Sequence, residues 1–302
     1  MNKGTWYAVA AYSLWGLFPL YWKMLKHIPA LQLIGHRIAW SFVSLFVVLL
    51  VIQQVKDFRR TALSFSIIRI YFLAAMLVGI NWLTYVWAVN SGHIVETSLG
   101  YYINPLISVL IGVIFFRERL RFWQWLPIAI AAIGVIYLTL ALGSLPWIAL
   151  TLAFSFAFYG MVKKLAPLGS LHGLTLETFM LFLPALFYLI FTELSGNGAL
   201  FHQGIGIDLL LIGTGLVTTI PLLLFASATK RIPLSVVGIL QYIAPTVQLF
   251  IGIAVYHEHF TLQQFIGYSF VWLALLIFGF DSYHAYRKKR NVSVSEQVIL
   301  QK

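Results

Sequence analysis

The chain has 302 residues, of which 61% are hydrophobic and 10% are charged, and its mean hydropathy is +0.89. This composition excludes an ordinary water-soluble domain and predicts an all-α integral membrane protein in contact with the lipid bilayer. The formal net charge of +11 gives no support for nucleic-acid binding, because Lys and Arg gather in the cytoplasmic loops of membrane proteins. The absence of Cys excludes disulfides, thiolate metal sites and thiol catalysis.

Ten segments are apolar and close to the length of about 20 residues that a spanning helix needs. The first follows a single Lys3 and lacks a convincing cleavage site, so we expect an uncleaved span. Short connections predict that consecutive helices are antiparallel neighbours. The predicted spans are 5–22, 31–53, 68–89, 95–116, 123–142, 145–162, 174–193, 208–229, 234–256 and 262–283.

The positive charges predict the orientation of these spans. With the amino terminus inside, every Lys and Arg falls in a cytoplasmic segment except Lys23, Lys26 and Arg37. Because cytoplasmic loops are enriched in Lys and Arg, both termini are expected inside.

Much of the sequence from Glu96 to Gln124 returns 140 residues later without a gap, so that Tyr102 aligns with Tyr242 and Pro105 with Pro245. Five spans per copy is an odd number, which predicts that the second copy enters the membrane upside down. We therefore expect two inverted five-helix halves, 1–143 and 144–285, and a polar cytoplasmic tail, 286–302.

Each copy carries a stripe of polar and small residues at helical spacing. Pro105 and Pro245 each lack a backbone donor, so the carbonyls four residues earlier, on Tyr101 and on Gln241, lose their helical partner. The stripes are either packing kinks or part of the lining of a pathway, and both readings stay open. Their members are Tyr101, Pro105, Ser108 and Gly112 in the first copy and Gln241, Pro245, Gln248 and Gly252 in the second.

Ionisable residues inside spans are costly and are seldom kept without a use. His36 and Arg37 lie within the second span, and Glu96 opens the fourth span from the same side, so we expect Arg37 and Glu96 to pair or to share a water-filled cavity. The alternative is that Glu96 caps its helix while carbonyls neutralise Arg37. Glu177, which enters from the cytoplasmic side, is either an acidic site at the inner mouth or a partner of a neighbouring Lys. His36, Glu96 and Glu177 are the candidates for a coupling proton.

Polar and aromatic residues on the first, third, fourth and ninth spans are the candidates for a substrate cavity, because buried amides need partners that a wet cavity provides. No P-loop is present, and His257-Glu258-His259 lacks the spacing of a metal site, so no cofactor and no metal are expected. With His36, Arg37 and Glu96, the candidates for the cavity and its gates are Trp15, Asn81, Tyr85, Tyr101, Tyr102, Asn104, Pro105, Gln241, Tyr242 and Pro245.

Several strings of the sequence resemble the EamA-type drug/metabolite transporters and, more narrowly, the RarD permeases. They include Ile34-Gly35-His36-Arg37-Ile38-Ala39-Trp40-Ser41, Ser98-Leu99-Gly100-Tyr101-Tyr102-Ile103-Asn104-Pro105 and Gln241-Tyr242-Ile243-Ala244-Pro245. The resemblance covers about residues 5 to 285. It implies a bacterial inner-membrane permease with a central cavity lined by the first, third, fourth, sixth, eighth and ninth spans, and it supplies no substrate.

The sequence therefore predicts a secondary-active transporter that exports a small amphiphilic metabolite or drug by alternating access, with proton coupling an open possibility. A membrane-embedded lipid-modifying enzyme is an alternative, although it would need a clustered nucleophile, acid and base. A channel or facilitator is a third reading, whose signature would be a ring of like residues. The expected partners are a small-molecule substrate and lipid, and the sequence does not indicate an oligomeric state.

Overall fold

The computed structural model describes residues 2–62, 64–91, 93–142, 146–256, 261–263 and 265–281. Within these residues the fold is entirely helical. The long helices are α1 (Lys3–Met24), α2 (Ala30–Val51), α4 (Phe65–Asn90), α5 (Ile94–Ile114), α6 (Phe122–Leu142), α7 (Trp147–Leu165), α8 (Ser170–Leu194) and α9 (Ile205–Thr229). The shorter ones are α3 (Val55–Ala62), α10 (Leu234–Leu240), α11 (Ile243–Tyr256) and a further apolar helix, Phe265–Asp281.

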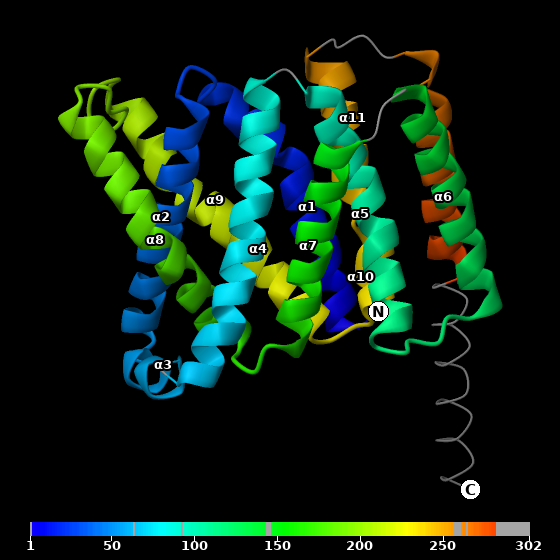
Figure 1. The fold of residues 1–302 in the computed structure, drawn as a ribbon, viewed down its shortest axis with the longest axis horizontal. Helices are drawn as coiled ribbons and strands as arrows, with labels where there is room; N and C mark the ends of the chain where they lie inside the picture. The colour runs from blue at the N-terminus through cyan, green and yellow to red at the C-terminus, as the bar shows by residue number, and fades with distance from the viewer. Residues whose placement is uncertain are drawn as a thin grey trace, which may run out of the picture.

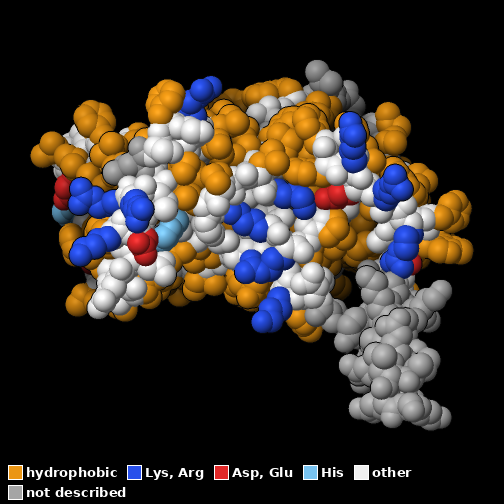
Figure 2. Space-filling model, turned by 90° about the horizontal axis from the view of Figure 1, so that it is seen from below, with side chains coloured by type: hydrophobic (Ala, Val, Ile, Leu, Met, Phe, Trp, Pro, Cys, Tyr) orange, Lys and Arg blue, Asp and Glu red, His pale blue; other side chains and the backbone are white. Residues whose placement is uncertain are grey.

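Eight stretches of the described chain are long and apolar enough to cross a membrane, one of which, Leu234–Tyr256, joins α10 and α11. Successive long helices run in alternating directions, so that the start of α1 and the end of the helix Phe265–Asp281 lie at the same end of the bundle (Figure 1). Lys and Arg side chains are spread across the face at that end (Figure 2). The all-α membrane fold expected from composition is confirmed.

Two features of the helices differ from the sequence prediction. The ninth predicted span, 234–256, is not continuous, because a turn at Gln241 and Tyr242 separates α10 from α11. Pro245 cannot donate to the Gln241 carbonyl, which instead accepts from the Ala244 amide at 3.2 Å, and this tighter bond breaks the α-helical pattern. The amphipathic helix α3 was not predicted, because at eight residues it is too short to give a spanning signal.

The packing order of the helices differs from their order in the chain. α2 packs against α8 and α9, α1 packs against α9 and α11, and α5 packs against α7 and α10. A small residue permits one of the closest approaches, since a methyl group added at Gly215 of α9 would lie 2.4 Å from the Trp40 carbonyl of α2. Helices that are distant in sequence are thereby brought around one central space. The loop around Glu258 and the tail 286–302 lie outside the described residues.

Candidate functional site

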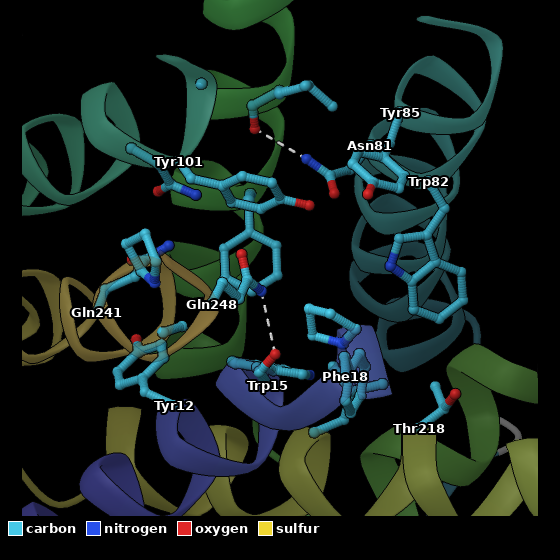
Figure 3. A pocket seen from close by; sticks show the side chains of 18 of the residues that line it. Tyr12, Trp15, Phe18, Asn81, Trp82, Tyr85, Tyr101, Thr218, Gln241 and Gln248 are labelled. Atoms are coloured by element: carbon cyan, nitrogen blue, oxygen red, sulfur yellow. Dashed lines mark hydrogen bonds between the residues drawn. The ribbon is translucent and has the colours of Figure 1, made fainter. Parts of the chain in front are cut away.

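A cavity of about 290 Å³ lies at the centre of the bundle. Its lining comes from α1, α4, α5, α7, α9 and α11 together with Gln241 and with Arg37 of α2. The helices α1, α4, α5, α7, α9 and α11 belong to the first, third, fourth, sixth, eighth and ninth spans, which are the six that the resemblance implied. Arg37 of α2 is an additional lining residue. The lining is Tyr12, Trp15, Phe18, Pro19, Trp22, Arg37, Asn81, Trp82, Tyr85, Gly100, Tyr101, Asn104, Leu152, Phe156, Thr218, Leu222, Gln241, Ala244, Pro245 and Gln248. Figure 3 shows the labelled members converging on the space from several helices.

The α1 wall of the cavity is shaped by a proline. Pro19 has no amide hydrogen, so the Trp15 carbonyl one turn earlier lacks its helical donor. Gln248 of α11 supplies the missing bond, donating from Nε2 to the Trp15 carbonyl at 3.1 Å (Figure 3). Tyr256 OH donates to the Pro19 carbonyl at 3.0 Å. Two side chains of α11 thus bond backbone carbonyls of α1.

The opposite wall comes from α4, α5 and α7. Asn81 of α4 donates from Nδ2 to the Leu152 carbonyl at 2.8 Å and to Ser155 Oγ at 3.0 Å, so its amide is held against α7. Tyr85, one turn further along α4, lies with its ring 6.1 Å from that of Tyr101 on α5. The spacing of Asn81 and Tyr85 on one helical face therefore places both in the cavity, as expected from the sequence.

Arg37 is the only cation among the described residues that line the cavity. It stands seven residues into α2, about 10 Å along the helix at 1.5 Å per residue. Arg37 Nε donates to Thr218 Oγ1 of α9 at 3.1 Å. The guanidinium carbon lies 4.8 Å from the Trp22 ring centre and 4.9 Å from that of Trp82. The charge is therefore held by a hydroxyl and two indole faces.

The predicted pairing of Arg37 with Glu96 is wrong. Glu96 Oε1 lies 3.2 Å from Nδ1 of His93, one turn earlier on the chain, and Glu96 is not among the residues that line the cavity. The reason is the packing order, because α2 lies against α8 and α9 whereas α5 lies against α7 and α10. The alternative holds only in part, because Glu96 lies in the first turn of α5 but no side-chain cap is formed there, and Arg37 bonds the Thr218 hydroxyl and not a carbonyl.

Residues of the two repeated segments are divided between the cavity and the core. Tyr101, Asn104, Gln241, Pro245 and Gln248 line the cavity. Pro105, Tyr102 and Tyr242 are not part of the lining, and both tyrosines are almost fully buried. Tyr242 OH donates to the Tyr102 carbonyl at 3.1 Å, which joins the two matching positions of the repeat.

His36 is placed away from the central cavity. It lines a second cavity of about 420 Å³ between α2 and α8, together with Trp40 and residues near the end of α8. Adjacent residues on a helix point about 100° apart, so Arg37 and His36 face different neighbours. His36 and Arg37 consequently do not form one site.

Glu177 lies in a buried network in the first part of α8. Its Oε1 is 2.6 Å from Lys163 Nζ, and its Oε2 accepts from Tyr159 OH at 3.0 Å. The Lys163 and Glu177 side chains are 1% and 2% exposed. Of the two sequence readings, the structure has the one in which Glu177 is the partner of a neighbouring Lys.

Glu118 makes contacts that the sequence analysis missed. Arg117 adopts a left-handed backbone and the Glu118 amide donates to the Gly112 carbonyl, so the chain turns back after α5. Glu118 then accepts from the Leu234 amide at 2.7 Å and from the Ser235 amide and hydroxyl at 2.9 and 2.7 Å. α10 has no side-chain cap of its own, so Glu118 supplies one. The recurrence of an acidic residue at Glu258 was the signal that could have identified this role.

The local environment favours the ionised form of Glu118. Burial alone raises the pKa of its carboxyl, but the hydrogen bonds from Ser235 and Leu234 and the Lys164 ammonium, 3.4 Å away, outweigh that effect. The net result is a pKa below the ordinary value for Glu. A charged carboxylate therefore links the loop after α5 to the start of α10.

Such an arrangement defines a class of protein: a multi-pass, all-helical membrane protein with a central cavity of the size that holds a small molecule. The chain belongs to the EamA-like transporter family, whose model matches residues 2–140 and 145–280. It is therefore a membrane transporter.

Relatives of known sequence agree with this family. The chain is 49% identical to the protein named uncharacterized transporter YojE from Bacillus subtilis, covering 93% of this chain and 94% of that protein. It is 42% identical to protein RarD from Streptomyces exfoliatus, covering 96% and 92%. A solved crystal structure with 17% identity has the same fold, with a TM-score of 0.66 over 91% of this chain and 97% of that one. The resemblance to the RarD permeases is confirmed.

Proposed function

We propose that this protein is a secondary-active transporter that exports a small amphiphilic molecule by alternating access. The observation that carries the proposal is the central cavity, which is built from helices of both matched stretches of the chain. Its walls are largely aromatic, with a few neutral amides, and such walls suit a molecule that has both an apolar and a polar part.

The proposed topology has ten spans in two inverted halves, 1–143 and 144–285, with both termini in the cytoplasm. Support comes from the two separate matches of the family model and from the alternating helix directions (Figure 1). The spread of Lys and Arg over the face that carries the start of α1 favours that face as the cytoplasmic one (Figure 2). The bacterial relatives favour the inner membrane as the location.

Support for alternating access comes from the position of the cavity along the bundle. The cavity residues Arg37, Asn81 and Tyr101 all lie in the halves of their helices that are distant from the start of α1. Toward the other end, the Lys163–Glu177 pair joins α7 to α8, and Glu118 joins the loop after α5 to α10. We infer that the structure faces outward and that these inner contacts must open for the reverse state.

Proton coupling is a further part of the proposal, with His36, Glu96 and Glu177 as its candidates. Each is a titratable group in or beside a span, but they lie on different helices and none lines the central cavity. We expect at least one of the variants His36→Gln, Glu96→Gln and Glu177→Gln to abolish the response of flux to an imposed pH gradient. Retention of the full response in all three would exclude these residues.

The main test is solute flux in liposomes that contain the purified protein. Inside-out and right-side-out vesicles loaded with a broad panel of amphiphilic metabolites and drugs would report both transport and its direction. Tyr101→Ala, in the cavity, should reduce flux, whereas Trp123→Ala, an exposed residue of α6, should leave it unchanged. No flux above that of empty vesicles across the panel would contradict the transporter mechanism, and product formation from a lipid would favour an enzyme.

A further inference from the structure

The charge distribution of the central cavity is one-sided. Its described lining contains Arg37 and has no Asp or Glu. Within the part of the chain that the structure describes, no carboxylate forms an ion pair with Arg37. The cavity therefore presents one positive charge without a protein counter-ion in these residues.

The guanidinium is held in place but keeps most of its donors. Its Nε bonds Thr218 Oγ1, and this is the hydrogen bond that Arg37 makes to the described residues. The Trp22 and Trp82 ring centres lie 4.8 and 4.9 Å from the guanidinium carbon, and these contacts restrict where the guanidinium can move. An Arg side chain has five N–H donors in a fixed fork, and the fork matches a carboxylate. Arg37 is thus positioned with donors available for an anion.

The energetics of this position favour an anionic ligand over a structural role. A charge within a span costs several kcal/mol and is ordinarily paired with another charge or used at a functional site. Thr218 is neutral and the two indoles offset only part of the lost hydration. A carboxylate placed against the fork would supply the missing opposite charge and two short charge-assisted hydrogen bonds.

The remaining walls define the rest of the ligand. Trp15, Phe18 and Phe156 provide apolar faces, and the Trp15 and Phe156 rings meet edge to face at 5.7 Å. Tyr12 lines the cavity, is fully buried, and its hydroxyl has no partner among the described residues. The volume of about 290 Å³ equals that of about ten waters at ~30 Å³ each, which limits the ligand to a small molecule.

We propose that the transported molecule is a small aromatic or similarly apolar monocarboxylate, with its carboxylate bound by Arg37 and its apolar part against the aromatic walls. The proposal rests on the transporter function proposed above and adds a substrate class to it. A free ammonium group on the ligand finds no carboxylate partner in the described lining, and it would lie in the same cavity as the positive charge of Arg37. The site therefore favours an anion over a zwitterion, an amide or an amine of the same shape.

The test uses four molecules with the same ring and chain: 3-phenylpropionate, 3-phenylpropanamide, 3-phenylpropylamine and phenylalanine. Binding to the purified full-length protein is measured by calorimetry, and flux is measured with labelled compounds in liposomes. We expect the wild type to bind the acid at least tenfold more tightly than the amide. Arg37→Gln should lower the affinity for the acid at least tenfold while changing that for the amide less than twofold.

Three further variants distinguish the effect of the Arg37 charge from that of its hydrogen-bonding geometry. Arg69→Gln removes an exposed Arg from α4 and should leave all four affinities unchanged. Arg37→Lys keeps the charge without the fork, and Thr218→Val removes the bond that orients the guanidinium, so both should lower the ratio of acid to amide affinity. If Arg37→Gln fails to fold, this ratio in the other two variants decides the outcome.

Several results would overturn the inference. Equal binding of acid and amide by the wild type, an unchanged ratio in the Arg37 and Thr218 variants, or no binding of any of the four at millimolar concentration would each contradict an anion site. If the anion site is contradicted but the amide or the amine is still transported in liposomes, the proposed transporter function is supported and only the substrate class is wrong. Binding of the acid that depends on Arg37, without flux, would support the site and contradict the transporter function.

Discussion

At the scale of single residues, the charged side chains at two sites inside the bundle show opposite arrangements. Lys163 and Glu177 satisfy each other away from water, with Tyr159 adding a third bond. Arg37 has a hydroxyl and two aromatic rings instead of a counter-ion. Because Lys163 and Glu177 form an ion pair with each other, we assign them a structural role. Among the described residues Arg37 has no ion-pair partner, which favours a role in binding a ligand.

Removal of one member of the buried pair should be strongly destabilising. We expect Lys163→Met to lower the free energy of unfolding by roughly 3–5 kcal/mol, because it leaves the Glu177 carboxylate buried and uncompensated. The double variant Lys163→Met with Glu177→Leu should recover much of this loss. Thermal unfolding in detergent measures both, with exposed Lys56→Met as the matched control. Equal midpoints for Lys163→Met and Lys56→Met would show that the pair contributes no stability.

At the scale of helices, Glu118 makes the start of α10 depend on the loop after α5. Glu118→Gln should cost roughly 1.5–3 kcal/mol at neutral pH, since a charged acceptor of three hydrogen bonds is replaced by a neutral one. Thermal unfolding at pH 7 measures the difference from the wild type.

The pH dependence of this difference has a defined sign. The folded protein holds the pKa of Glu118 below its ordinary value, so the carboxylate's contribution is present above that ordinary value and is lost as pH falls through the lowered pKa. The gap in stability between wild type and Glu118→Gln should therefore shrink on acidification from pH 5 to pH 3. A gap that stayed constant over this range would show that ionisation of Glu118 is irrelevant to the cap.

Close packing between α2 and α9 depends on Gly215. An added methyl group would approach the Trp40 carbonyl carbon and oxygen to 2.4 Å, so Gly215→Ala must separate the two helices. We expect a loss of roughly 1–3 kcal/mol by thermal unfolding, together with weaker positioning of Arg37 against Thr218. Gly206→Ala, in the same helix with nothing within 4 Å, is the control and should be neutral or slightly stabilising. Equal effects of the two substitutions would contradict the close contact.

At the scale of the whole molecule, the proposed topology can be tested with single cysteines, because the natural chain has none. Lys56→Cys in α3 and Ser195→Cys after α8 lie at exposed positions near opposite ends of the bundle. A membrane-impermeant maleimide should label Ser195→Cys in intact cells and Lys56→Cys only after permeabilisation. The reverse pattern would invert the proposed orientation, and the unmodified chain gives the background.

The positions of the helices and much of the cavity could be predicted from sequence, whereas contacts between distant helices could not. Apolar length and helical spacing were sufficient for Asn81, Tyr85 and Tyr101, because the position of each depends only on its own helix. The bond from Arg37 to Thr218 depends on α2 lying against α9, and nothing in one sequence states which spans adjoin. Pro19 has no amide hydrogen, so the sequence could have shown that the Trp15 carbonyl needs a donor from outside α1. It could not have shown that Gln248 is this donor.

The position that matches Arg37 in the repeat gives the cavity a direction. At an offset of 141, one residue more than the offset that aligns Tyr102 with Tyr242, Glu177 aligns with His36 and Thr178 with Arg37. The Thr178 hydroxyl donates to the Leu174 carbonyl within its own helix. In the proposed arrangement of two halves, the charge in the described cavity lining therefore comes from the first half only. If Arg37 binds a carboxylate, the transported molecule has a charged end and an apolar end, and we expect it to bind and cross the membrane in one fixed orientation. A symmetrical dicarboxylate of the same length would place its second carboxylate against aromatic rings, and we therefore expect it to bind more weakly than the monocarboxylate.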